Sequence, residues 1–126
     1  MAVVFNSLRP ILRTKDLKGT IAFHTQRLGF VCEGFSAEDG RASLRRNAVE
    51  LMAAMPNAHV PFDAPVFTGS FYFNVDDVAA LWVEVKDVAE VAYPLETFHY
   101  GMSEFAIYDN NGYMLQFGAP ATKDTG

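Results

Sequence analysis

The sequence contains the same pattern twice, and this repeat constrains the fold more than any other feature. In the first half the strand-like run "LRPILRT" leads into "KDLKGTIAFHTQRLGF", where Asp16 is placed to cap a helix. In the second half "SFYFNV" leads into "DDVAALWVEVKDVAEV", with Asp76 or Asp77 as the cap. Asp77 stands 77 − 16 = 61 residues after Asp16. Each half therefore begins with a strand followed by a helix.

Three short strand-like runs follow each expected helix. They read "FVCEGFS", "ASLRR" and "AVELMAAM" in the first half, and "VAYPL", "SEFAIYD" and "YMLQF" in the second. The first helix is expected to end at Gly29. The second is expected to carry one apolar stripe, formed by Val78, Leu81, Trp82, Val85 and Val88. Each half is thus predicted to be a β-α-β-β-β module, and the fold class is α+β.

The length of 126 residues allows one domain, which we expect to span residues 1–126. The segment "PNAHVPFDAP" holds three of the six prolines, and we interpret residues 56–65 as a linker in which His59 is solvated. Module 1 then covers about residues 7–55, and module 2 about residues 66–118.

Charge and composition exclude several partners. A net charge of −5 with 10 scattered Lys and Arg argues against nucleic acid. No apolar run approaches the roughly 20 residues of a membrane helix, and "MAVVFNSLRP" does not resemble a signal peptide. The single cysteine, Cys32, fits a reducing compartment, and we interpret it as a small buried hydrophobe. We expect a cytoplasmic protein.

The stretch "FAIYDNNGYMLQF" predicts a hairpin whose turn is "DNNG". Its second strand carries Gln116, a neutral amide. A glutamine can orient a ligand by hydrogen bonds, but it cannot take a proton and is a poor metal ligand. Gln116 can also serve only to pair with a neighbouring backbone group.

The repeated module, with "KDLKGTIAFHTQRLGF" near its start and "FAIYDNNGYMLQF" near its end, resembles the vicinal oxygen chelate superfamily. Glyoxalase I, extradiol dioxygenases, fosfomycin-resistance proteins and bleomycin resistance proteins belong to it. The resemblance covers roughly residues 8–118 and is closest to the bleomycin-resistance-like members. It implies two tandem βαβββ modules that form a cup-shaped curved mixed sheet with a ligand inside, and it implies a homodimer.

Metalloenzymes of this superfamily place His, Glu or Gln at four inward strand positions, which the resemblance maps onto Arg9, Glu50, Ser70 and Gln116. Arginine cannot bind a metal cation, and serine is a weak ligand. Glu50 matches a ligand position, and Gln116 matches only in part. We therefore expect no metal, no cofactor and no catalytic residue.

The same positions suit a binding site. Arg9 and Glu50 are expected to pair, either as a purely structural contact or to meet a charged ligand. Strand alternation puts Ile11, Met52, Tyr72 and Met114 on the same face. The segment from 93 to 105 resembles a flexible loop of the bleomycin-resistance-like members. Its aromatic side chains Phe98, His99 and Tyr100 are expected to close over a flat ligand. The candidate ligand-binding residues are Arg9, Glu50, Ser70, Tyr72, Phe98, Tyr100, Met114 and Gln116.

These observations favour a binding protein of the bleomycin-resistance type, which sequesters an aromatic or cationic small molecule without chemistry. The alternative is a metal-dependent lyase, isomerase or dioxygenase of the glyoxalase type. A dimeric regulatory or chaperone-like protein is a third class that the sequence leaves open.

Overall fold

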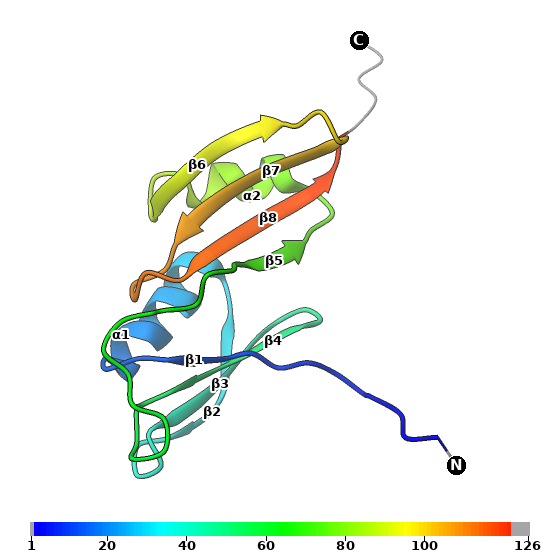
Figure 1. Cartoon of the computed structure of the whole chain (residues 1–126). Helices are drawn as coiled ribbons and strands as arrows, with labels where there is room; N and C mark the ends of the chain where they lie inside the picture. The colour runs from blue at the N-terminus through cyan, green and yellow to red at the C-terminus, as the bar shows by residue number, and fades with distance from the viewer. Residues whose placement is uncertain (1, 122–126) are drawn as a thin grey trace. The chain divides into compact units, whose positions relative to one another are not determined.

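The computed structural model describes residues 2–121 of the chain. The chain divides into two compact units, Met1–Asp63 and Ala64–Gly126. Each unit holds one four-stranded mixed sheet and the helix expected from the repeat (Figure 1). The predicted α+β class with two βαβββ modules is confirmed.

The first unit contains β1 (Ile11–Arg13), α1 (Leu17–Ala22), the π-helical turn η1 (Phe23–Arg27), β2 (Val31–Ser36), β3 (Arg41–Arg46) and β4 (Val49–Ala54). The strand order is β1-β4-β3-β2, with β1 parallel to β4 and the other pairs antiparallel. Leu17 of the helix packs against Ala42 and Ala53 of the sheet, with Ile21 and Cys32 at the margin. Cys32 is thus half-buried, close to the role expected of it.

The helix of the first unit begins and ends as its sequence predicts. The Asp16 carboxylate accepts a hydrogen bond of 2.9 Å from the Gly19 N–H. Gly29 follows the helix with φ +71°, a left-handed conformation that suits glycine. The His24 side chain is fully buried, with Nδ1 2.8 Å from the Thr20 carbonyl oxygen.

The second unit contains β5 (Phe71–Asn74), α2 (Val78–Val85), β6 (Glu90–Thr97), β7 (Met102–Tyr108) and β8 (Met114–Pro120). Its strand order, β5-β8-β7-β6, repeats that of the first unit, and β5 is parallel to β8. Helix α2 packs on one face of this sheet, where the Trp82 and Phe105 rings lie 5.1 Å apart. Asp77, rather than Asp76, caps the helix by accepting from the Ala80 N–H at 3.0 Å.

Two local expectations are wrong. Val88 lies beyond the end of α2, because the helix stops at Val85 and the Val88 N–H bonds the Val85 carbonyl in a turn. The expected loop from 93 to 105 is mostly strand, since β6 runs to Thr97 and β7 starts at Met102. Only a tight turn separates them. The Phe98 N–H donates to the Met102 carbonyl oxygen, and the Gly101 N–H donates to the Phe98 carbonyl oxygen.

The hairpin turn is formed as expected. One carboxylate oxygen of Asp109 accepts from the backbone N–H groups of Asn111, Gly112 and Tyr113, and Gly112 has φ +100°. Between β4 and β5 the chain forms neither helix nor strand, and His59 is exposed there. Within residues 2–121 no helix is long and apolar enough to cross a membrane.

Candidate functional site

In the first unit, Glu50 is held by two arginines. Its Oε2 accepts from Arg9 Nη2 at 2.8 Å and from Arg9 Nε at 3.0 Å, and its Oε1 pairs with Arg45 Nη2. Arg45 also reaches Glu33 at 3.0 Å. The expected Arg9–Glu50 pair is therefore present, and Arg45 is a partner that the sequence analysis missed. Both oxygens of Glu50 are already engaged by cations.

In the second unit, a group of polar and aromatic side chains gathers on the sheet face opposite α2. Tyr72 of β5 lies opposite Gln116 of β8, which in turn lies opposite Ala106 of β7. Gln116 Nε2 donates to the Tyr93 hydroxyl at 2.7 Å, and its Oε1 accepts from the Ser70 hydroxyl. Both ends of the Gln116 amide thus bond side chains rather than the backbone.

A buried carboxylate lies next to this pair on the same face. Glu104 of β7 is only 5% exposed, and it alternates with Phe105, whose ring faces α2. The Tyr72 hydroxyl donates to Glu104 Oε2 at 2.6 Å, and the Tyr100 hydroxyl donates to Oε1 at 2.7 Å. The sequence analysis missed Glu104. The only signal for it was a charged residue inside the otherwise apolar run "SEFAIY".

Gly118 of β8 makes room for the bond between Tyr72 and Glu104. Glu104 pairs with Gly118 across the β7–β8 ladder, so the Tyr72 side chain has to pass over Gly118 to reach Glu104. A Cβ at position 118 would lie 1.9 Å from the Tyr72 hydroxyl oxygen and 3.1 Å from Glu104 Cγ. The absence of a side chain at Gly118 is therefore a requirement of this arrangement.

Glu104 and burial also make both tyrosines harder to deprotonate. Its hydrogen bond, together with burial, raises the pKa of Tyr100 to about 12. Burial and then the same carboxylate raise the pKa of Tyr72 even further above its usual value. At neutral pH both phenols are therefore hydrogen-bond donors to Glu104.

Aromatic rings at the β6–β7 turn border this cluster. The Phe98 and Tyr100 rings are stacked, with centroids 5.5 Å apart and planes 5° apart, and Tyr93 meets Phe98 edge-on at 6.0 Å. Met114 lies two residues before Gln116 on β8 and is half-buried. The structure thus brings together Ser70, Tyr72, Phe98, Tyr100 and Gln116 within the second unit. Arg9 and Glu50 form a separate pair in the first.

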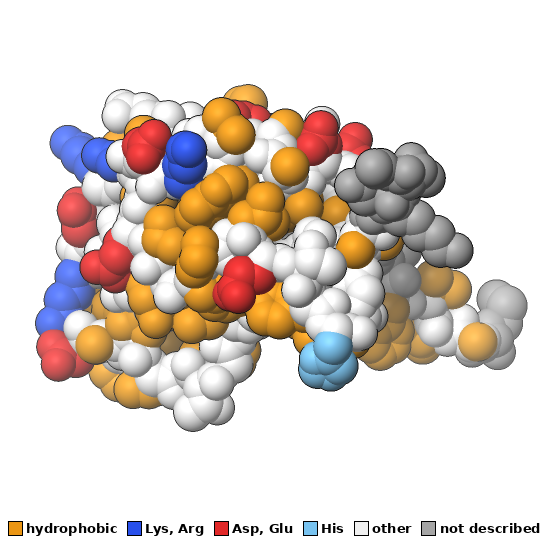
Figure 2. Space-filling model, turned by 90° about the horizontal axis from the view of Figure 1, so that it is seen from above, with side chains coloured by type: hydrophobic (Ala, Val, Ile, Leu, Met, Phe, Trp, Pro, Cys, Tyr) orange, Lys and Arg blue, Asp and Glu red, His pale blue; other side chains and the backbone are white. Residues whose placement is uncertain are grey.

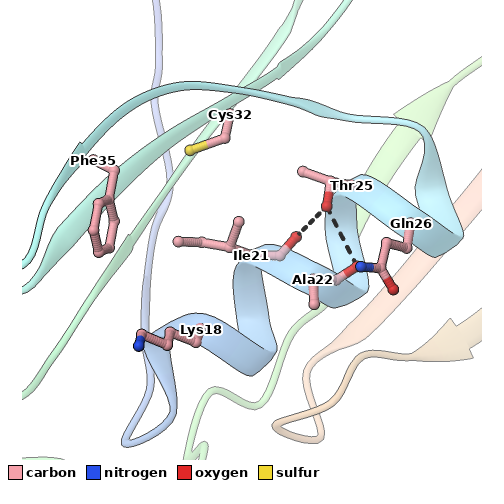
Figure 3. A pocket seen from close by; sticks show the side chains of 7 residues that line it. All are labelled: Lys18, Ile21, Ala22, Thr25, Gln26, Cys32 and Phe35. Atoms are coloured by element: carbon pink, nitrogen blue, oxygen red, sulfur yellow. Dashed lines mark hydrogen bonds between the residues drawn. The ribbon is translucent and has the colours of Figure 1, made fainter.

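A shallow groove of about 380 Å³ lies elsewhere, between the first-unit helix and β2 (Figure 3). Its lining side chains belong to Lys18, Ile21, Ala22, Thr25, Gln26, Cys32 and Phe35. The Thr25 hydroxyl donates a hydrogen bond of 2.8 Å to the Ile21 carbonyl oxygen. The groove is therefore mostly apolar and contains none of the predicted site residues.

The four positions mapped from the metalloenzymes do not fit a metal ion. Arg9 donates to Glu50, Ser70 bonds Gln116, and neither arginine nor a neutral amide supplies the ligands that zinc or iron prefers. Strand pairing also makes Met52, rather than Glu50, the counterpart of Gln116, because Ile11 lies opposite Met52 as the equivalent Tyr72 lies opposite Gln116. Over residues 2–121, no group of three or more His, Cys, Asp or Glu side chains is arranged to hold a metal.

Comparison with known proteins agrees with this architecture. Residues 5–117 match the family model described as the Glyoxalase/Bleomycin resistance protein/Dioxygenase superfamily. The chain belongs to this superfamily. A search of curated protein sequences finds no match.

Solved structures of the superfamily share the fold. A bleomycin resistance determinant encoded on the transposon Tn5 is 22% identical, with a TM-score of 0.74 over 92% of this chain and 98% of that chain. A glyoxalase/bleomycin resistance protein/dioxygenase from Nocardioides is 17% identical, with a TM-score of 0.73 over 99% and 91%. A putative glyoxalase family protein from Bacillus anthracis is 14% identical, with a TM-score of 0.75 over 95% and 99%. At these identities the likeness shows the fold alone.

The charge of this superfamily member is distributed unevenly between its units. Residues 64–121 contain one lysine and eight Asp or Glu, a formal charge of −7, whereas residues 2–63 contain eight Lys or Arg and six Asp or Glu, a charge of +2. On the face that Figure 2 shows, acidic side chains stand beside a gathering of hydrophobic ones. The second unit, which carries the side chains around Glu104 and Gln116, is therefore strongly acidic.

Proposed function

We propose that the protein binds a small aromatic or cationic molecule without chemical change, as a bleomycin-resistance-type binding protein would. The observation that supports this most is the convergence of tyrosine rings, an amide and a buried carboxylate on one sheet face. Ser70, Tyr72, Tyr93, Tyr100, Glu104 and Gln116 make up what we call the tyrosine face. Aromatic surfaces with a few fixed polar groups are typical of small-molecule sites.

The residues of the tyrosine face favour binding over catalysis. The Gln116 amide cannot act as an acid or a base at neutral pH. The pKa values of Tyr72 and Tyr100, whose hydroxyls bond Glu104, are raised further above neutral pH. A general acid or base works best when its pKa lies near the working pH. The alternative is a metal-dependent lyase, isomerase or dioxygenase, and it receives no support from residues 2–121, where no group of three or more His, Cys, Asp or Glu side chains is arranged to hold a metal.

Calorimetry against a panel of aromatic and cationic compounds tests the proposal. The fold shared with the Tn5 bleomycin resistance determinant makes bleomycin a reasonable panel member. We expect at least one compound to bind and to be recovered unchanged. Gln116→Leu should weaken that binding several-fold, while Gln26→Leu, the same change at an exposed position of the first unit, should not. Conversion of the compound, or equal effects of the two substitutions, would contradict the proposal.

We further propose that the two units act together as one domain, with residues 56–65 as their linker. The free edges of two four-stranded sheets favour assembly as a homodimer. The lone half-buried cysteine is consistent with a reducing compartment, and we propose the cytoplasm as that compartment.

A further inference from the structure

We propose that the ligand of the tyrosine face is an organic cation with N–H donors, such as a protonated amine or an amidinium, and that Glu104 rather than Glu50 is its anionic anchor. This inference rests on the proposed function and names the class of compound that the site takes. It follows from how protons and charges are distributed around Glu104.

The two tyrosines leave only acceptors for a ligand. A phenol has one hydroxyl proton to donate in a hydrogen bond. The hydroxyls of Tyr72 and Tyr100 both donate to Glu104, at 2.6 Å and 2.7 Å. Toward a ligand, each phenol oxygen therefore offers lone pairs and no proton. A ligand that meets this part of the face has to bring the donors itself, because a second acceptor would be left unpaired.

Among residues 64–121, the described part of its unit, no basic residue pairs with Glu104. Its hydrogen-bond partners are two neutral phenols, and Lys86 is the only lysine or arginine between residues 64 and 121. Lys86 lies at the C-terminal cap of α2, the helix on the opposite face of the sheet. A buried carboxylate without a cation gains from a cationic ligand, and the surrounding charge of −7 attracts one.

Glu50 is in the opposite situation. Its two oxygens are paired with Arg9 and Arg45, so its charge is already compensated. A cationic ligand would have to displace a guanidinium from it, and the neighbouring arginines would repel the ligand. This is why the structure favours Glu104 as the anchor, although the sequence analysis selected Glu50.

The cluster is accessible from solvent through its rings. Tyr72 is 39% exposed and Tyr100 is 55% exposed, while Glu104 beneath them is 5% exposed. A cation above these rings lies within reach of the aromatic faces and of the phenol oxygens at once. Because Glu104 itself is shielded from water, its attraction for that charge is stronger than between two fully exposed charges.

Three small probes separate the contributions of charge and hydrogen bonding. Benzamidinium is an aromatic cation with N–H donors, benzamide is its neutral analogue of nearly the same shape, and benzyltrimethylammonium is a cation without donors. We expect benzamidinium to bind the tyrosine face about tenfold or more tightly than benzamide, with benzyltrimethylammonium between them. Binding is measured by titration of the full chain, followed by NMR and calorimetry.

Substitutions then test the anchor. Glu104→Gln should reduce the preference for benzamidinium over benzamide to within about threefold, while Glu50→Gln and the exposed control Glu90→Gln should leave it intact. Tyr100→Phe is a second variant that removes an acceptor oxygen at an exposed ring, so it keeps the test usable if Glu104→Gln does not fold. It should weaken benzamidinium several-fold and benzyltrimethylammonium little.

The outcomes distinguish the two levels of the proposal. Equal binding of benzamide and benzamidinium, or a preference that survives Glu104→Gln, overturns the inference while the binding function stands. If Glu50→Gln instead removes the preference for benzamidinium over benzamide, the anionic anchor is Glu50 of the first unit and not Glu104. No binding of any probe or panel compound overturns the proposed function itself.

Discussion

Gly118→Ala is the substitution whose effect follows most directly from the structure. The new methyl group would lie 1.9 Å from the Tyr72 hydroxyl oxygen and 2.7 Å from its Cζ, so the tyrosine side chain has to move away. That movement breaks the 2.6 Å hydrogen bond to Glu104. The backbone itself tolerates alanine, because Gly118 is not among the glycines with positive φ.

The magnitude comes from two opposing contributions. Loss of a hydrogen bond to a charged group costs about 1.5–3 kcal/mol, and Tyr72 is partly exposed, so water replaces part of that bond. Replacing glycine with alanine stabilises by about 0.4–1 kcal/mol through the unfolded chain. We therefore expect Gly118→Ala to lower the free energy of unfolding by about 1–2 kcal/mol, measured by urea denaturation.

A double-mutant cycle with Tyr72→Ala provides the control. In that background the Tyr72 ring no longer occupies the space above Gly118, and only Glu104 Cγ, 3.1 Å from the new Cβ, has to shift slightly, so Gly118→Ala should be close to neutral. The same cost in both backgrounds would show that the Tyr72–Glu104 contact is not what Gly118 accommodates, and would refute the reasoning.

Four further predictions follow from other parts of the molecule. Asp77→Ala should lower the free energy of unfolding by about 1 kcal/mol, while Asp76→Ala changes it little, because only Asp77 caps α2; equal losses in denaturation experiments would contradict this. The free energy of unfolding should fall as pH rises from about 10 to about 12, because the folded state holds the Tyr100 and Tyr72 protons more tightly than the unfolded chain does. In the double variant Tyr72→Phe/Tyr100→Phe, most of this decrease in the free energy of unfolding should disappear. The same pH dependence in the variant and the wild type would contradict this prediction. Protein purified without chelators should carry far less than one transition metal per chain, and elemental analysis showing one per chain would disprove this. Sedimentation at tens of micromolar should give a dimer, and a monomer at that concentration would rule out the proposed assembly.

The sequence predicted the fold well because the signals for it are local. The Asp caps, the helical apolar spacing and the glycines at the turns each act over a few residues, and the structure contains Asp16, Asp77, Gly29 and Gly112 in those roles. The errors have local causes too. Val88 fits the apolar stripe of a longer α2, and the "ETFHYG" segment has the composition of a loop although only its centre forms a turn.

The site was less predictable because it depends on which strands are neighbours. Arg9 and Glu50 were expected to pair, but Arg45 reaches the second oxygen of the same carboxylate only because β3 lies beside β4. Glu104 looked like an ordinary charged residue near a turn. Glu104 is buried because Gly118 on the adjacent strand leaves room for the Tyr72 side chain to cover it. This contact joins three strands, so the residue pattern of a single strand does not predict it.

The central claim is that this protein binds its ligand at the tyrosine face of the second unit. The most direct measurement is an NMR titration of isotope-labelled full chain with the aromatic and cationic panel. We expect chemical-shift changes centred on Tyr72, Tyr100, Glu104 and Gln116, and we expect to recover the compound unchanged. Shift changes confined to the first unit, around Arg9 and Glu50 or along the groove beside Phe35, would contradict it.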